Sequence, residues 1–540
     1  MKEVIHYTHK NFYSTQLFHD VQLSGIFEDS KTFVDTIPKH SLEEIITCYE
    51  TEKQQPNFQL DVFILTHFQL PPSIELCPKQ QELLQQLDMV EHCKQVLQYS
   101  FRQPLNVDEP GSFINLKLPY IIPGGRFREM YYWDTYFTAE GLAPLGRIQE
   151  VEHLIQNFAD LIDRFGYIPN GNRTYYLGRS QPPFFALILN LLHRCEGITA
   201  VLPYVKQLEK EYHFWMDGAD KVREANAEPA YRRVVRIEPG VVLNRYYSDT
   251  AMPRPESYKE DIEAFKQFKF QMQQHGNPIN DEATDFYREI CAAVESGWDF
   301  SSRWQHTVNG VARIRATELI PVDLNALLYY MEMQLGRYYA WLDETQLSNF
   351  YNQAAIQRKE AIDKYCWNQT DGLYEDYCWL ESINKQKIIH SSKKSLATVV
   401  PLFVKLCDEE KAETIAHTLE SEFFVFCEQH GGGLSTTLEL STEQWDWHNA
   451  WSPLQSMAFY GLKNYNLDKT HYVANKIRTA WLTLTHSHYQ RERKMVEKYN
   501  VSSSAAGMGG EYAVQEGFGW TNAGVICFDT DTPFDPYPNS

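Results

Sequence analysis

The sequence predicts a mostly helical protein in which apolar helices alternate with long loops rich in glycine, proline, aromatic and charged residues. Residues 151–165 place their apolar side chains at the three- and four-residue spacing of one helical face. Similar patterns run through 326–342, 395–406, 455–465 and 470–489. Evidence for strands is sparse, and the best candidate is a hairpin within residues 231–247 around Pro239-Gly240.

Nothing in the composition divides the chain into separate units. The 540 residues contain no serine/glycine linker, no low-complexity tract and no long block of like charge. We therefore expect residues 1–540 to form a single domain. Acidic residues outnumber basic ones by 71 to 50, which gives a formal charge of −21. Such a surface repels phosphate backbones and anionic lipids, so we expect no nucleic acid and no membrane as partner.

The location predicted from the sequence is the cytoplasm. The N-terminus carries no apolar segment of the kind that a signal peptide needs, and no run of residues is apolar enough to cross a membrane. The ten cysteines are scattered and form no CxxC pair, which indicates reduced and mostly buried thiols.

Residues 123–137, PGGRFREMYYWDTYF, combine aromatic rings with charged side chains. A sugar ring suits this mixture, because its C–H faces stack on aromatic rings and its hydroxyls bond carboxylates, amides and guanidinium groups. Arg126, Trp133 and Asp134 are the candidates in this stretch. Taken alone, each feature has an ordinary structural explanation: a buried tryptophan beside a turn, or an arginine stacked on a tyrosine.

The same mixture recurs along the chain, and its recurrence favours a binding site. It appears in IPNGNRTYYLGRSQPP (168–183), PRPESY (253–258), ESGWDFSSRW (295–304), EQWDWHNAWSPLQ (443–455) and GGEYAVQEGFGWTN (509–522). The sequence has no HExxH motif, no Cys/His cluster, no GxSxG motif and no phosphate-binding loop. We therefore expect neither a catalytic metal nor a cofactor.

These loops, in this order, resemble trehalases of the cytoplasmic type, the inverting glycosidases that split α,α-trehalose into two glucose molecules. PGGRFREMYYWDTYF and QWDWHNAWSPLQ resemble the two signature motifs of that family, and the resemblance extends over roughly residues 17–530. It implies an all-α fold, an (α/α)6 toroidal barrel with long loops and minor β-hairpins. Residues 1–60 are then expected to form an N-terminal segment packed on the barrel, and the protein to be a monomer.

The resemblance also implies roles for individual residues. Asp299 matches the general acid and Glu497 the general base, although Glu497 alone, within KMVEKYN, has the pattern of an exposed helix residue. A further set matches positions that contact the substrate: Arg126, Trp133, Asp134, Asn170, Arg179, Ser180, Gln181, Arg254, Pro255, Glu256, Gly297 and Glu511.

An inverting mechanism requires Asp299 to keep its proton near neutral pH, so we expect its pKa to be raised by burial beside Trp298 or by a neighbouring carboxylate. Three departures from the family pattern concern the loops: His448-Asn449-Ala450 in the second signature, a glycine run before Glu511 that is interrupted by alanine and methionine, and Asn500 after the EKY triplet. Two alternatives stay open. One is another enzyme on the same barrel, an α-glucosidase or a glycoside phosphorylase; the other is a sugar-binding protein without catalysis.

Overall fold

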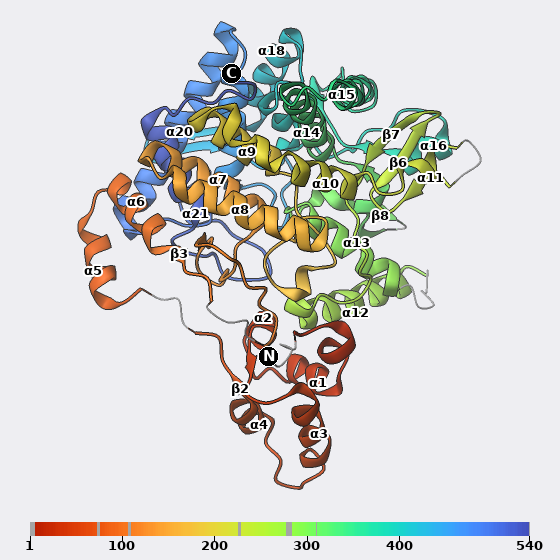
Figure 1. Ribbon diagram of the computed structural model, residues 1–540, viewed down its shortest axis with the longest axis vertical. Helices are drawn as coiled ribbons and strands as arrows, with labels where there is room; N and C mark the ends of the chain where they lie inside the picture. Colours follow the sequence, from red (N-terminus) through yellow and green to blue (C-terminus); the bar gives the residue numbers. More distant parts are fainter. Residues whose placement is uncertain are drawn as a thin grey trace.

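The computed structural model describes residues 6–72, 76–105, 110–224, 228–276, 283–308 and 310–538 (Figure 1). Its centre is a ring of six helices that pack side by side in the closed order α21, α7, α9, α14, α17, α19 and back to α21. Their bounds are α7 (Tyr132–Leu142), α9 (Phe185–Glu196), α14 (Val322–Trp341), α17 (Val399–Phe403), α19 (Ser452–Lys463) and α21 (Gly519–Thr530).

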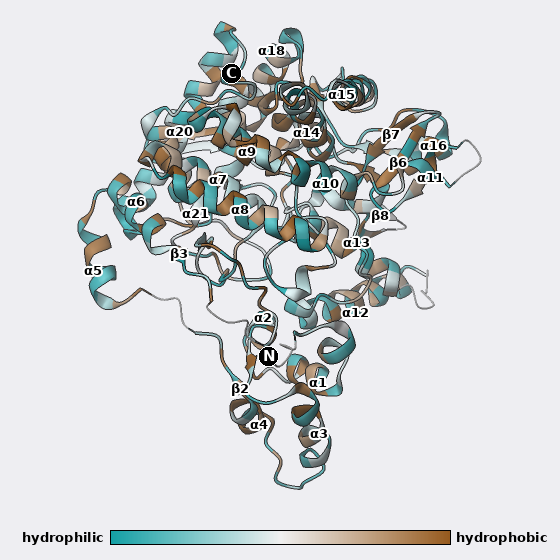
Figure 2. Cartoon of the chain, viewed as in Figure 1, coloured by the Kyte–Doolittle hydropathy of each residue, from teal (hydrophilic) through white to brown (hydrophobic). Residues whose placement is uncertain are grey.

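The inner helices are buried on all sides, because each lies between two neighbours of the ring and the helices outside it. Every residue of α7 and of α17 is buried, and so are Gly519–Phe528 of α21. Figure 2 shows the contrast with an outer helix, since α8 alternates between brown and teal. A helix that is apolar all round belongs inside a protein, and one with a single apolar stripe belongs at its boundary.

The helices that cover the ring have one apolar face. In α8 the buried apolar side chains are Val151, Leu154, Ile155, Phe158, Ala159, Leu161 and Ile162, so the stripe predicted for 151–165 is confirmed. Inner and outer helices alternate along the chain, which confirms the predicted (α/α)6 barrel. The outer helices are α6 (Met89–Tyr99), α8 (Ile148–Phe165), α10 (Val205–Trp215), α15 (Thr345–Tyr365), α18 (Glu409–Thr418) and α20 (Asp468–Glu492).

The remaining helices lie in the N-terminal segment and in the connections. They are α1 (Gln16–Ser24), α2 (Lys31–Val34), α3 (Leu42–Glu52), α4 (Leu60–His67), α5 (Pro78–Gln86), α11 (Ala219–Arg223), α12 (Tyr258–Gln274), α13 (Ala283–Glu295) and α16 (Trp379–Lys385). Among the helices that the structure describes, none is both long enough and apolar enough to cross a lipid bilayer.

Short strands pair within and between the connections. The predicted hairpin is confirmed by antiparallel β6 (Val234–Glu238) and β7 (Val241–Asn244), which β5 (Ala230–Tyr231) extends. β16 (Asn449–Trp451) pairs with β17 (Lys498–Asn500), which joins the connections before α19 and α21. The other pairs are β1 (Ile37–Pro38) with β2 (Phe68–Gln69), β3 (Phe101–Arg102) with β4 (Tyr120–Ile121), β8 (Gln305–Val308) with β9 (Val311–Ile314), β10 (Leu319–Ile320) with β13 (Tyr377–Cys378), β11 (Trp367–Asn368) with β12 (Leu373–Tyr374), and β14 (Phe424–Cys427) with β15 (Gly431–Leu434).

Helices α1–α4 lie at one end of the molecule, below the barrel in Figure 1. Their apolar side chains form a cluster that also includes Tyr131, Tyr175, Tyr176 and Tyr258 from the loops of the barrel. The segment is therefore not held by polar contacts alone: apolar side chains of both parts share one buried cluster.

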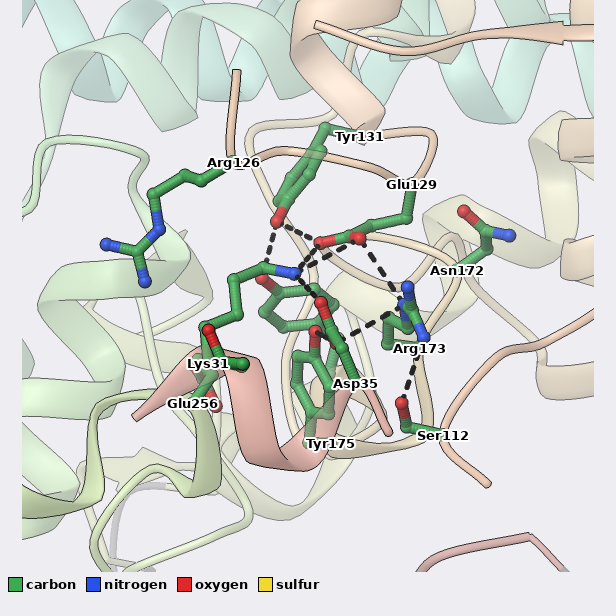
Figure 3. A network of polar contacts seen from close by, with 12 residues as sticks. Lys31, Asp35, Ser112, Arg126, Glu129, Tyr131, Asn172, Arg173, Tyr175 and Glu256 are labelled. Atoms are coloured by element: carbon green, nitrogen blue, oxygen red, sulfur yellow. Dashed lines mark hydrogen bonds and ion pairs between the residues drawn. The ribbon is translucent and has the colours of Figure 1, made fainter. Parts of the chain in front are cut away.

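A buried ionic network crosses the same boundary (Figure 3). The Lys31 ammonium lies 2.5 Å from an Asp35 carboxylate oxygen and 2.9 Å from Glu129 Oε1, and Arg173 Nε lies 3.3 Å from Glu129 Oε2. The side chains of all four residues are at most 8% exposed. The Tyr131 hydroxyl donates to Glu129 and lies 2.6 Å from the Tyr176 hydroxyl. Two cations thus offset two buried carboxylates, which makes each member costly to remove alone.

Replacing Lys31 by methionine is expected to lower the free energy of unfolding by about 3–5 kcal/mol, because Asp35 and Glu129 then share only Arg173. The measurement is a urea titration followed by circular dichroism. Lys94→Met is the control, since Lys94 pairs with Glu91 in an exposed i,i+3 pair and its loss is expected to cost about 0.5 kcal/mol or less. Equal losses in the two variants would contradict a structural role for the network.

Candidate active site

A pocket with about 740 Å³ of empty space lies where α7, α9, α19 and α21 begin. Its lining comes from connections far apart in the sequence. All the predicted site residues but two take part: Arg126, Trp133, Asp134, Asn170, Arg179, Gln181, Arg254, Glu256, Gly297, Asp299, Glu497 and Glu511. The structure therefore brings both predicted catalytic carboxyl groups into one space.

Ser180 and Pro255, also predicted to contact the substrate, are buried and are not among the residues that line this pocket. The Ser180 hydroxyl donates to the Ile168 carbonyl at 2.6 Å, and the Ser180 N–H donates to Glu295 Oε1 at 3.0 Å. The Pro255 carbonyl accepts a hydrogen bond from Gln22 Nε2 at 2.8 Å. Both residues position the loops that carry their neighbours Arg179, Gln181, Arg254 and Glu256.

Several lining residues were not predicted. They include Lys31, Phe127, Tyr131, Tyr176, Ser257, Gln444, Trp445, Trp451, Tyr512, Phe518 and Trp520. Most lie inside the aromatic loops described above, so their residue types and their positions in these loops could have identified them as lining residues. Lys31 had no such signal, because it comes from the N-terminal segment.

Asp299 has the raised pKa that is expected of a proton donor. The pKa of its carboxyl is raised to about 7, because burial and the Glu511 charge raise it more than the Arg254 guanidinium lowers it. The structure agrees with the predicted rise in the pKa of Asp299 and with its two predicted causes, burial and a neighbouring carboxylate. The Trp298 ring lies 5.3 Å from Trp445, which lines the pocket. At neutral pH a substantial fraction of Asp299 is thus protonated.

Glu497 is buried and held by its neighbours. It precedes β17 and is 1% exposed, so the exposed helix position indicated by KMVEKYN alone is wrong. The Tyr512 hydroxyl donates to Glu497 Oε1 at 2.8 Å, and the Gln515 N–H donates to Oε2 at 3.4 Å. Burial raises the pKa of Glu497, while Lys498, Tyr512, Gln515 and Arg126 lower it. Donors that bond both oxygens favour the ionised form and fix its orientation.

Asp134 is a third buried carboxyl group of the pocket. Burial raises its pKa well above the ordinary value, and the charges of Glu497 and Asp299 add to the shift. Like charges in one poorly solvated space cannot all ionise at low cost. The pocket therefore holds protonated and ionised carboxyl groups side by side, which is the requirement for acid and base catalysis in one site.

Two arginines organise the opposite wall. Arg254 bonds Asp261 and also lies 2.7 Å from Glu511 Oε1. Arg179 donates to Asn170 Oδ1 at 3.0 Å and to Glu256 Oε1 at 2.6 Å. These pairs keep buried charges compensated, and Arg179, Arg254, Glu256 and Glu511 all line the pocket.

Indole rings form an apolar wall. Trp445 stacks on Trp451 with ring centroids 3.9 Å apart, and Trp133 lies 5.7 Å from Trp445 and 6.0 Å from Trp520. Gly297 packs directly against this wall: its φ of +76° suits glycine, and a Cβ there would lie 2.9 Å from Trp133. Flat apolar rings opposite polar side chains suit a ring-shaped polyhydroxylated ligand.

Two buried polar atoms of the lining have no hydrogen-bond partner among the described residues. They are Arg126 Nε, a donor, and Glu256 Oε2, an acceptor. Buried polar atoms are normally bonded, so a donor and an acceptor without partners indicate a ligand that offers both functions. A hydroxyl group does so.

Two of the three departures from the family pattern, His448 and Asn500, contact the same residue, Ser502. His448 contacts the Ser502 hydroxyl at 3.0 Å, and Asn500 accepts from the Ser502 N–H at 2.8 Å. Of the glycines before Glu511, Gly509 is required by its surroundings: φ is +76° and a Cβ would lie 2.3 Å from the Thr442 carbonyl oxygen. No three His, Cys, Asp or Glu side chains gather as a metal-binding group in the part of the chain that the structure describes.

Comparison with known proteins gives close relatives over nearly the whole chain. The periplasmic trehalase of Escherichia coli O1:K1 is 40% identical over 509 residues, which cover 94% of this chain and 84% of that protein. The periplasmic trehalase of Salmonella paratyphi B is 40% identical over 533 residues, covering 97% and 88%.

These relatives contradict the predicted location and the cytoplasmic type: both are periplasmic proteins by name. The prediction of a cytoplasmic location was wrong because its only grounds were the lack of an apolar signal segment and the lack of paired cysteines. All ten cysteines are free in the structure, but a reduced or buried thiol does not identify a compartment.

A solved structure of the neutral trehalase from Saccharomyces cerevisiae is also similar, with 25% identity, a TM-score of 0.59, and coverage of 76% of this chain and 73% of that one. A mannosylglycerate hydrolase from Thermus thermophilus, solved with glucose, shares the fold at 16% identity and a TM-score of 0.50, covering 82% and 100%. The family model for trehalase matches residues 25–530. The chain belongs to the trehalase family.

Proposed function

We propose that this glycoside hydrolase cleaves α,α-trehalose into two glucose molecules by a single displacement with inversion, with Asp299 as general acid and Glu497 as general base. The observation that carries the proposal is the pocket that contains both carboxyl groups, one with a pKa of about 7 and the other oriented by two donors. The 40% identity to trehalases over 94% of the chain supports the substrate.

In the proposed reaction, Asp299 donates its proton to the glycosidic oxygen as the bond to one anomeric carbon breaks. Glu497 takes a proton from a water molecule, whose oxygen bonds that carbon from the opposite face. One glucose leaves as the α anomer and the other forms as the β anomer. Asp299 ends ionised and Glu497 protonated, so one proton transfer between them through solvent restores the starting state.

Substrate recognition follows from the walls of the pocket. The indoles of Trp133, Trp445 and Trp520 offer flat faces for sugar rings. Arg126 Nε and Glu256 Oε2 are free to bond hydroxyls. We propose that the other predicted contacts, except Ser180 and Pro255, act in the same way.

We also propose that the whole chain works as one domain, with the N-terminal segment, residues 1–60, packed on the barrel. The shared apolar cluster and the Lys31 network support this arrangement. Residues 1–5 and 539–540 of that proposal lie outside the described residues. The monomeric state stays a prediction, which light scattering of the purified protein tests.

Proton NMR of the purified protein with α,α-trehalose tests the reaction and its stereochemistry together. We expect α- and β-glucose to appear at equal rates before mutarotation, without any need for phosphate. Early release of the α anomer alone would contradict inversion. A requirement for phosphate would identify a phosphorylase, and trehalose that binds without being cleaved would identify a non-catalytic protein.

Replacing each carboxyl group by its amide separates the roles. Asp299→Asn and Glu497→Gln are expected to lower kcat for trehalose by about 10³-fold or more, since each loses a proton-transfer group. Glu511→Gln is expected to keep measurable turnover, because Glu511 pairs with Arg254 and transfers no proton.

α-Glucosyl fluoride distinguishes acid from base, because fluoride leaves without a proton. Asp299→Asn is expected to regain most of the wild-type rate with this substrate, and Glu497→Gln is not. The base assignment is wrong if Glu511→Gln is inactive while Glu497→Gln retains turnover.

The pH profile of kcat/KM is expected to be bell-shaped. Activity falls as pH rises through about 7, because Asp299 loses the proton that it must donate. It falls at acidic pH as Glu497, whose pKa is raised above its ordinary value by burial, becomes protonated.

Glu511→Gln is expected to move the basic limb of that profile to lower pH, since the Glu511 charge raises the pKa of Asp299. Glu492→Gln is the control, because Glu492 is an exposed residue paired with Arg491. A basic limb that stays in place in Glu511→Gln, as in the control, would argue against Asp299 as the titrating acid.

A further inference from the structure

A second cavity adjoins the active-site pocket at Arg126. It has about 1660 Å³ of empty space and is bordered by α6, by the β3–β4 pair, by residues 124–128 and by residues 493–495. Among the described residues, Arg126 alone borders both spaces, so the two linings are otherwise distinct.

The lining of the second cavity is strongly cationic. Arg102, Arg126, Arg128, Arg493 and Lys494 all border it, and Glu516 is the one acidic residue of its described lining. The Lys494 ammonium lies 2.8 Å from the Glu516 carboxylate, so these two charges offset each other. Such a concentration of positive charge is unexpected in a chain whose formal charge is −21.

Three of these guanidinium groups have no carboxylate partner among the described residues. Arg102 donates to the carbonyls of Tyr99 and Phe101, and Arg493 donates to those of Gln85 and Leu87. Arg128 keeps a buried Nε atom without a hydrogen-bond partner. These three arginines are partly exposed and lack a counter-charge among the described residues, which an anion entering the cavity would supply.

The chemistry of the residues that line the cavity indicates the class of the anion. Guanidinium groups bond oxyanions with two parallel N–H donors, and phosphate offers three oxygens to several such groups at once. The cavity is also lined by Leu84, Val96, Tyr99 and Ile122, which provide an apolar surface beside the charges. A small molecule with a phosphate group and an organic part fits both features.

We propose that the second cavity is a binding site for a small phosphorylated molecule, held by Arg102, Arg128 and Arg493. The site is separate from the sugar pocket, and binding there does not depend on cleavage of trehalose. Arg126 brings it into contact with the active site, because its backbone N–H donates to Gln515 Oε1 at 2.7 Å and the Gln515 N–H donates to Glu497.

The experiment is isothermal titration of the full chain with pyrophosphate, the probe, at low salt. We expect saturable binding at one site and a fall in affinity of at least tenfold in the double variant Arg128→Gln/Arg493→Gln. Arg337→Gln is the matched control: Arg337 also bonds a backbone carbonyl, that of Pro538, but lies outside the cavity. Its affinity is expected to equal that of the wild type.

A second variant tests the charge argument in the opposite direction and leaves the arginines in place. Glu516→Gln frees Lys494 from its partner, so affinity is expected to rise about threefold. The proposal is overturned if the wild-type chain does not bind pyrophosphate, if the double variant binds it as tightly as the wild type, or if Glu516→Gln weakens binding. None of these readouts uses trehalose, so they stand apart from any failure of the proposed hydrolysis.

Discussion

Closure of the ring of inner helices is the constraint on which the rest of the structure depends. Because α21 packs against α7, the last helix of the barrel and the first are neighbours. Trp133 at the start of α7 and Trp520 at the start of α21 therefore meet, with ring centroids 6.0 Å apart. Helices packed on every side have no free face to offer a ligand, so the ligand-binding groups gather where the helices begin. The connections at that end are long because they, and not the helices, form the pocket.

Burial of many carboxyl groups in such a pocket creates an electrostatic problem, and its solution yields the acid and the base. Arg254 compensates Asp261 and Glu511, and Arg179 compensates Glu256. Asp299 forms no such ion pair in the described structure, so its burial is left partly uncompensated and it holds its proton. Glu497 is equally buried but accepts hydrogen bonds at both oxygens, which favours the anion. Asp299 and Glu497 carry the same functional group, and their different surroundings suit one to act as the acid and the other as the base.

The sequence could predict the barrel and most of the pocket for a definite reason. Helical periodicity at 151–165 reflects a single buried face and predicted a helix, whereas the barrel and the site residues were implied by the resemblance of the long aromatic loops to a known family. Glu497 was beyond local reasoning, since its burial depends on the pairing of β17 with the distant strand β16 and on its contacts with Tyr512 and Gln515. Lys31 was missed because its contacts with Glu129 connect distant parts of the chain. The cytoplasmic location was predicted wrongly because the amino-acid composition of a chain does not determine its compartment.

The N-terminal segment shows how far the active site extends beyond the barrel. Gln22 donates to the Pro255 carbonyl, and the Ser30 hydroxyl donates to Glu260, so helix α1 and its neighbours fix the turn that carries Arg254 and Glu256. From the other side, Lys31 holds Glu129, whose partner Tyr131 contacts Tyr176, and the Tyr176 ring lies 5.0 Å from the Arg179 guanidinium. Arg179 and Arg254 of this pocket thus depend on contacts made outside the ring. A barrel deprived of this segment would keep its core, whereas its substrate-binding wall would lose the groups that hold it in place.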